Sequence, residues 1–293
     1  MKIKALARAK INLTLEVLGK RPDGYHEVAM VMQSIELHDY LEFSTAPSGI
    51  ELKVKGDGAP ANKDNLVYRA AELLQGYKGL TRGAHILLQK NIPVAAGLAG
   101  GSSDAAATLI GLNKLWGAGL SLPELMELGA RLGSDIPFCL IGGTALARGR
   151  GEKMEPLPAC PDMGLVLVKP PHELSTARVY QAFDQVEPAF KPEHSELVKG
   201  LINKDLKAIC SHLGNMLEPA AIKMLPVIAV IKEKLRLAGA MGVLMSGSGP
   251  TVYGLAPDLA TAQAVAARYQ RQDEEVIVSR IAKTGISEYI SCD

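Results

Sequence analysis

The stretch Pro93-Val-Ala-Ala-Gly97-Leu-Ala-Gly-Gly101-Ser-Ser-Asp104 is the most informative part of this sequence. Its glycines and alanines place almost no side chain between the backbone and an approaching ligand. If a helix follows, the backbone N–H groups of the loop converge at the helix N-terminus, where they and the helix dipole attract anions. The stretch therefore predicts a phosphate-binding loop. A plain glycine-rich turn before a helix is the alternative.

Residues 105–116, directly after this loop, have the spacing of an amphipathic helix. Four apolar residues recur at intervals of four, three and four positions, the pattern of one buried helix face. They are Ala105, Leu109, Leu112 and Trp116. Ser102, Ser103 and Asp104 are favourable capping residues, and Gly117-Ala-Gly119 predicts the end of the helix. We therefore expect a loop–helix unit that is capped at 102–104.

The composition predicts a globular chain. Its 293 residues are 47% hydrophobic, enough for one large domain or two ordinary ones. The net charge is only +1, so no basic footprint for nucleic acid is visible. No apolar run approaches the roughly 18–20 residues of a membrane span, and charges interrupt the N-terminus too often for a signal peptide. We therefore expect a cytoplasmic protein without nucleic-acid or membrane partners.

The cysteines carry no site signature. Cys139, Cys160, Cys210 and Cys292 are far apart and form no C-x-x-C pair. This spacing predicts neither a zinc site nor a disulfide framework.

Residues 2–17 alternate between apolar and polar side chains, which predicts a half-buried strand. Arg8, Lys10 and Asn12 fall on the polar side of this pattern. They could form an ordinary solvated face. A strand that is buried on one side and lines a cleft on the other would show the same pattern.

Two common nucleotide-binding motifs, G-x-x-x-x-G-K-[ST] and G-x-G-x-x-G, are absent from the sequence. The stretch 93–105 instead resembles the second motif of the GHMP kinases, P-x-x-x-G-L-G-S-S-[AD]-A. Residues 246–251, Ser-Gly-Ser-Gly-Pro-Thr, resemble their third motif, and residues 133–138, Gly-Ser-Asp-Ile-Pro-Phe, resemble their G-x-D-[IV]-P-F segment. The resemblance covers most of the chain. Ala95, Ala96 and Ala99 depart from it, because many relatives have glycine there.

The N-terminal segment is similar to one branch of this family. Ala9-Lys-Ile-Asn-Leu13 and Asp23-Gly-Tyr-His26 match its A-K-I-N-L and D-G-Y-H elements. Homoserine and mevalonate kinases lack D-G-Y-H. The resemblance implies ATP-dependent phosphorylation of the 2-hydroxyl of a diphosphocytidyl methylerythritol, a step of non-mevalonate isoprenoid biosynthesis. A tyrosine face could stack on the pyrimidine, and an imidazole could hydrogen-bond its edge.

The resemblance also implies an α+β fold with two domains. The N-terminal domain, 1–156, would be similar to the second domain of ribosomal protein S5, and the C-terminal domain, 157–293, would be ferredoxin-like. The Pro-rich residues 157–162 are the expected boundary. ATP and a small-molecule substrate would meet between the domains. Mg²⁺ is expected to enter with ATP, without a dedicated metal site in the protein, and the chain would be a monomer or a homodimer.

Site roles follow from the same resemblance. Asp135 would be the catalytic base and Lys10 would keep it ionised, while Asn12 would orient phosphate or substrate. Tyr25, His26 and Tyr180 would hold the cytidine end. ATP phosphates would be bound by Pro93, Val94, Ala95, Ala96, Gly97, Leu98, Ala99, Gly100, Gly101, Ser102 and Ser103. A helix cap at Asp135 and a packing role for Tyr180 are the alternatives.

Two other functions remain open at this level. The first is another GHMP kinase of the homoserine or mevalonate type, which D-G-Y-H disfavours. The second is a non-catalytic nucleotide-binding module, which would not need both Lys10 and Asp135.

Overall fold

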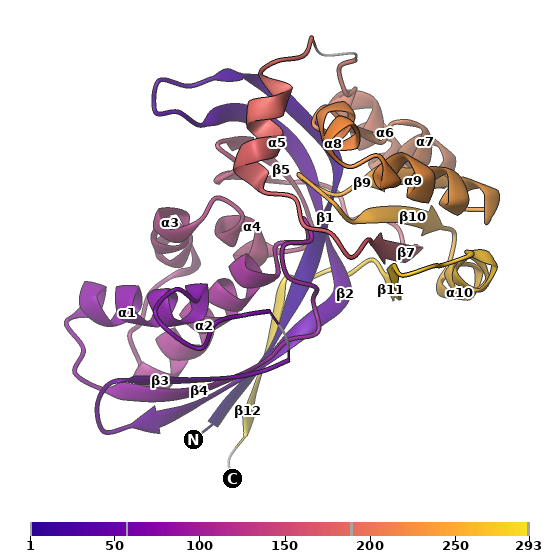
Figure 1. Cartoon of the computed structure of the whole chain (residues 1–293). Coiled ribbons are helices and arrows are strands. Elements are labelled where there is room, and N and C mark those ends of the chain that lie inside the picture. The colour runs from indigo at the N-terminus through magenta and orange to yellow at the C-terminus, as the bar shows by residue number, and fades with distance from the viewer. Residues whose placement is uncertain (1, 57, 188–189, 292–293) are drawn as a thin grey trace.

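The computed structural model describes residues 2–56, 58–187 and 190–291 and contains two β-sheets (Figure 1). The larger sheet has eight strands in the order β12-β1-β2-β4-β3, with β5 and β6 continuing from β2 and β8 pairing with β1. Its strands are β1 (Lys2–Lys20), β2 (His26–Ala46), β3 (Ile50–Lys55), β4 (Gly83–Gln89), β5 (Thr144–Gly149), β6 (Lys153–Pro156), β8 (Gly214–Asn215) and β12 (Ile286–Ser291).

Four helices accompany this sheet. They are α1 (Leu66–Lys78), α2 (Gly100–Trp116), α3 (Leu122–Leu132) and α4 (Ile136–Ile141). Helix α3 packs on the other three rather than on the strands. Helix α2 is the central one and presses so closely on β2 that a Cβ on Gly111 would lie 2.6 Å from the Phe43 ring. The four-three-four apolar pattern predicted this helix. All four residues of the pattern are buried.

The smaller sheet has four strands in the order β11-β7-β10-β9, and all neighbours are antiparallel. The strands are β7 (Gly164–Lys169), β9 (Gly242–Met245), β10 (Val252–Ala256) and β11 (Glu275–Arg280). The accompanying helices are α5 (Thr176–Phe183), α6 (His194–Asn203), α7 (Leu206–Ser211), α8 (Glu218–Met224), α9 (Val227–Leu237) and α10 (Leu259–Arg268). Helices lie between β7 and β9 and between β10 and β11. This β-α-β-β-α-β arrangement is the ferredoxin-like topology that was expected.

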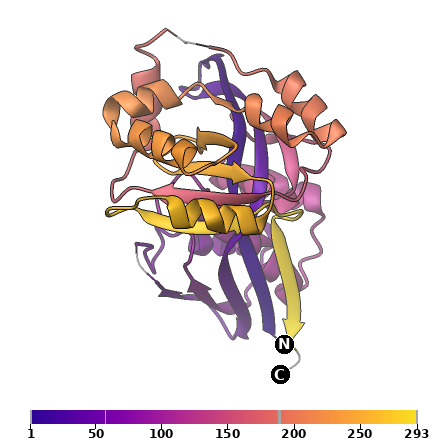
Figure 2. The same cartoon turned by 90° about the vertical axis from the view of Figure 1, so that its right-hand side faces the viewer.

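The long strands β1 and β2 connect the two halves of the molecule. In Figure 2, the strands of the smaller sheet cross in front of β1 and β2. Strand β11 is not the last strand of the chain. After β11 the chain returns to the larger sheet, where β12 pairs antiparallel with β1. The division at residues 156 and 157 remains a proposal.

Strand β1 is more buried than its alternating pattern predicts. Every residue from Ala9 to Val17 is buried, because elements from both halves of the chain cover the two faces of the strand. Lys10 and Asn12 are 4% and 0% exposed, which excludes an ordinary solvated face. Arg8 lies nearer the strand end, where its Nε is 3.1 Å from Glu36 Oε2.

The expected caps of α2 were also wrong. The N-cap is Ala99, in the left-handed region with φ 56°, and residues 102–104 lie within the helix. Ser103 Oγ instead donates to the Arg8 carbonyl at 2.6 Å, and Asp104 pairs with Lys90 at 2.8 Å. These side chains therefore bind β1 and the residue after β4 rather than the start of their own helix. No helix within the described ranges has the length and apolar character needed to cross a membrane.

Candidate active site

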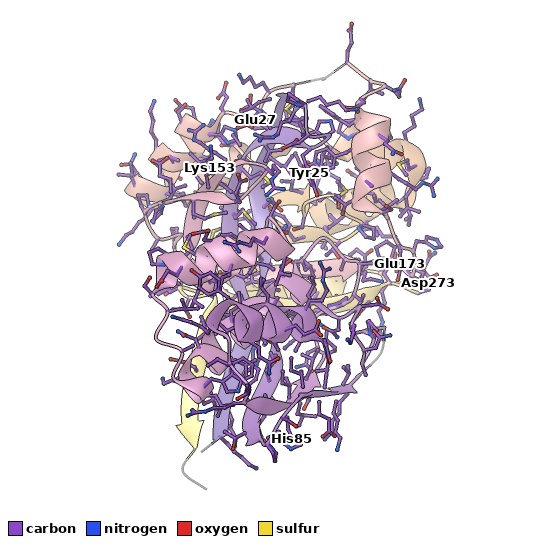
Figure 3. All side chains as sticks on the ribbon, turned by 90° about the vertical axis from the view of Figure 1, so that its left-hand side faces the viewer. Tyr25, Glu27, His85, Lys153, Glu173 and Asp273 are labelled. Carbon is purple, nitrogen blue, oxygen red and sulfur yellow. The ribbon has the colours of Figure 1, made fainter. Side chains whose placement is uncertain are left out.

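A cavity of about 970 Å³ opens among β1, the β1–β2 hairpin, the N-terminus of α2 and helix α5. Residues that are far apart in the sequence line this cavity together. Of the site residues expected from the sequence, Ser103 alone does not line it, because its hydroxyl faces the Arg8 carbonyl. Figure 3 shows Tyr25 and Glu27 toward one end of the molecule, near the β1–β2 hairpin, with His85 at the other end.

Lys10 and Asp135 lie side by side in this cavity. The Lys10 Nζ is 2.7 Å from Asn12 Oδ1 and 3.7 Å from Asp135 Oδ2. The Lys10 side chain is 5% exposed and that of Asp135 is 32% exposed. Asp135 precedes α4, but its side chain makes no capping hydrogen bond. Its carboxylate is therefore available to the cavity, with one partly desolvated cation beside it.

The loop before α2 presents backbone N–H groups to the cavity. The N-cap residue Ala99 offers no side-chain acceptor, so the N–H groups of the first helical turn have no side-chain cap. Two hydrogen bonds hold the loop: Lys10 N donates to Leu98 O at 3.1 Å, and Ser246 Oγ donates to Gly97 O at 3.0 Å. The arrangement can bind an anion through main-chain donors.

The segment 246–250 also reaches the cavity, although the sequence placed no site residue there. Gly247 and Ser248 line the cavity, and a Cβ on Gly247 would lie 3.3 Å from Lys10 Nζ. Asn215 Nδ2 donates to Gly247 O at 2.7 Å and to Met245 O at 2.9 Å. The family-like string at 246–251 was the signal that could have identified these positions.

A buried ionic cluster adjoins the same loop and was missed from the sequence. Lys90 Nζ lies 2.5 Å from Asp39 Oδ2 and 2.8 Å from Asp104 Oδ2. Asp39 Oδ1 also accepts from the backbone N of Asn91 and of Ile92. Burial, together with the charge of Asp39, raises the pKa of Asp104 well above its ordinary value. The three members come from β2, from just after β4 and from α2, so no local pattern links them.

The other end of the cavity is aromatic. The His26 and Tyr180 rings are stacked, with centroids 4.7 Å apart and an interplanar angle of 27°. Tyr25 is 55% exposed, and the Arg150 guanidinium carbon lies 4.9 Å from its ring centroid. Burial, followed by the charge of Asp135, raises the pKa of Tyr180. His26 also contacts Asp184, a residue that the sequence did not single out.

Comparison with known proteins shows which family the chain belongs to. Residues 65–143 match the model of the GHMP kinases N terminal domain, and residues 197–275 match that of the GHMP kinases C terminal domain. A 4-diphosphocytidyl-2-C-methyl-D-erythritol kinase of Pelotomaculum thermopropionicum is 60% identical over 96% of this chain and 98% of its own length. The chain belongs to the 4-diphosphocytidyl-2-C-methyl-D-erythritol kinase family of GHMP kinases.

Solved structures place this kinase in the same fold. A crystal structure of a 4-(cytidine 5'-diphospho)-2C-methyl-D-erythritol kinase superposes with a TM-score of 0.81 at 34% identity, covering 95% of this chain and 98% of the other. A homoserine kinase from Cytophaga hutchinsonii gives a TM-score of 0.78 at 20% identity, covering 98% of this chain and 97% of the other. The second likeness extends only to the fold. The kinase therefore has the expected α+β GHMP architecture and uses ATP.

Proposed function

We propose that the kinase transfers the γ-phosphoryl group of ATP to the 2-hydroxyl of 4-diphosphocytidyl-2-C-methyl-D-erythritol, producing the 2-phosphate and ADP. The observation that carries the proposal is the single cavity that contains Lys10, Asp135, the main-chain anion loop and the aromatic end. The 60% sequence identity between this chain and a 4-diphosphocytidyl-2-C-methyl-D-erythritol kinase supports the choice of acceptor. The product belongs to isoprenoid precursor synthesis.

Asp135 is the catalytic base in this proposal. Its carboxylate accepts the proton of the 2-hydroxyl as the oxygen attacks the γ-phosphorus, and the bond from that phosphorus to the β–γ bridging oxygen breaks to release ADP. Lys10, whose Nζ lies 3.7 Å from Asp135 Oδ2, stabilises negative charge on the transferring group. Asn12 fixes the Lys10 ammonium through its 2.7 Å contact.

The loop from Pro93 to Ser103 binds the triphosphate in this proposal. The helix dipole contributes only about 0.3–2 kcal/mol, so the affinity depends on the converging N–H groups together with Lys10. Gly97 lets the loop approach the 246–250 segment, and Ala99 leaves the first turn of α2 without a side-chain cap. The cavity side of the loop is thus formed by backbone rather than by bulky side chains.

A magnesium ion fits this site only as part of the nucleotide complex. Across the described residues, no group of three or more His, Cys, Asp or Glu side chains could hold a metal. Mg²⁺ commonly takes one or two protein ligands and completes its shell with phosphates and water. Asp135 and the Ser102 hydroxyl, which both line the cavity, are the residues that would hold it. When bound, it would neutralise phosphate charge.

The aromatic end holds the cytidine in this proposal. Tyr25 offers an exposed ring face for stacking on a pyrimidine, and the His26–Tyr180 pair supplies a rigid wall with a polar imidazole edge. Binding the base far from the reacting hydroxyl orients the acceptor, because interactions with remote substrate groups can be used for positioning.

ATP-dependent release of ADP with a panel of acceptors tests the proposal. Diphosphocytidyl methylerythritol, homoserine and mevalonate are offered separately, with Mg²⁺ present and with EDTA in parallel reactions. Release with the cytidyl acceptor alone is the expected result. Release with another acceptor would keep the chemistry and overturn the substrate. ATP binding without release to any acceptor would favour a non-catalytic nucleotide-binding module.

A further inference from the structure

A contact between α5 and the β1–β2 hairpin adjoins the aromatic end of the cavity, where the cytosine of the proposed acceptor would bind. His26 Nε2 lies 2.7 Å from Asp184 Oδ1, and Lys20 Nζ lies 2.7 Å from Asp184 Oδ2. Asp184 follows the last turn of α5, so one carboxylate joins this helix to both arms of the hairpin. Figure 1 shows α5 beside the tip of that hairpin.

The chemistry of this contact determines which imidazole nitrogen carries the proton. An ionised carboxylate only accepts hydrogen bonds, so a neutral His26 must carry its proton on Nε2. The hydrogen bonds that Asp184 accepts from Lys20 and His26 lower its pKa, which keeps it ionised. The other ring nitrogen, Nδ1, is then an acceptor. Among the groups that the structure describes, none forms a hydrogen bond with His26 Nδ1.

The imidazole ring of His26 is also held in its plane. Tyr180 stacks on it at 4.7 Å, and both residues line the cavity. The Asp184 contact prevents rotation about the Cβ–Cγ bond of His26, and the stack prevents tilting. A ring held in both ways presents a fixed acceptor, which is the role that carboxylates commonly have beside functional histidines.

We propose that Asp184 is a positioning residue for nucleobase selectivity: it holds His26 as the Nε2–H tautomer, so that Nδ1 accepts a hydrogen bond from the exocyclic amine of cytosine. Uracil has a carbonyl oxygen at that position, and two acceptors would face each other there. The inference rests on the proposed function, because it concerns the cytidine end of the proposed acceptor. Lys20 pairs with the other oxygen of Asp184, and among the described residues it forms no hydrogen bond with the His26 ring.

The test compares the cytidine acceptor with its uridine-diphosphate analogue. Steady-state kcat/KM is measured for wild type, Asp184→Asn and Lys20→Met. An Asn side chain can donate as well as accept, so it does not select one imidazole tautomer. We expect Asp184→Asn to reduce the cytidine-to-uridine preference by roughly tenfold to hundredfold. Most of the change should appear in KM, because the base is remote from the transferred phosphoryl group.

Lys20→Met is the matched control, since it removes the other partner of the same carboxylate. Lys20 is 61% exposed, and the variant keeps the Asp184–His26 contact. Its base preference should equal that of wild type. Unchanged selectivity in Asp184→Asn, or an equal loss in both variants, would overturn the proposal; an equal loss would leave Asp184 a general tether of the hairpin.

A second measurement reads the tautomer directly. Imidazole ¹⁵N chemical shifts, assigned with His26→Gln, should show a protonated Nε2 and a bare Nδ1 in wild type and a tautomer mixture in Asp184→Asn. Identical shifts in the two proteins would contradict the proposal. Absence of turnover with both acceptors would refute the proposed function and the cytosine assignment, while the NMR result would still show whether Asp184 sets the tautomer.

Discussion

The Ser246 hydroxyl donates a hydrogen bond to the Gly97 carbonyl at 3.0 Å, although 149 positions separate the two residues in the sequence. A Cβ on Gly97 would lie 2.3 Å from the Ser246 carbonyl oxygen, which is much closer than a carbon atom can approach. Gly97 also has a φ of +75°. The phosphate loop and the 246–250 segment can therefore meet only if position 97 carries no side chain.

Gly97→Ala should destabilise the protein through both the clash and the left-handed backbone. We expect a loss of about 2–5 kcal/mol in the free energy of unfolding, together with weaker ATP binding, because the loop must move. Urea denaturation and ATP titration measure the two effects. Gly117→Ala is the control: its φ is +63° but its Cβ would meet nothing within 4 Å, so about 1–2 kcal/mol is expected. Equal losses in both variants would show that the contact at Gly97 is unimportant.

Asp135→Asn tests the proposed base. The amide has nearly the same shape but cannot take a proton, so kcat should fall by about 10²–10⁴. The melting temperature should change little, because the Asp135 side chain is 32% exposed and caps no helix. Single-turnover ADP formation measures the chemical step. Near-full turnover by the variant would remove Asp135 from the mechanism.

Lys90→Met should destabilise the protein strongly, because Asp39 and Asp104 would be left buried without their cation. Breaking a buried pair in this way typically costs about 3–5 kcal/mol. Lys53→Met is the matched control: this lysine is 75% exposed beside Glu51, and its loss should change stability by less than about 1 kcal/mol. Urea denaturation of both variants measures their free energies of unfolding. Similar small effects would mean that the buried cluster adds nothing to stability.

Asp104 should make stability depend on pH in an unusual direction. Its pKa is raised in the folded state, so between the unfolded and folded pKa values the folded protein binds more protons. The free energy of unfolding contributed by this group is therefore present below the unfolded pKa and is lost as pH rises toward the folded pKa. The free energy of unfolding of the wild type minus that of Asp104→Asn should therefore fall as pH increases from about 4 toward neutrality.

Urea denaturation at a series of pH values measures this difference. Asp162→Asn serves as the control, because its carboxylate is 84% exposed, and its difference from wild type should stay flat. A wild-type advantage over Asp104→Asn that grows with pH would contradict the assignment of a raised pKa.

Local patterns predicted much of the fold. The apolar spacing behind the glycine-rich loop identified α2, although its N-cap was misplaced. Period-two alternation identified β1, but it could not distinguish a solvated face from a cleft. That distinction depends on what covers the strand, which a local pattern does not contain.

The sequence by itself determined β1, α2, the glycine-rich loops and the residue types available for chemistry, because backbone propensities and apolar periodicity act over a few neighbouring residues. Tertiary structure alone decided that Lys90 meets Asp39 and Asp104, that His26 meets Asp184, and that β12 returns to β1. Each of these pairings joins distant segments through burial and charge. Such energies depend on distance in space and not on separation along the chain.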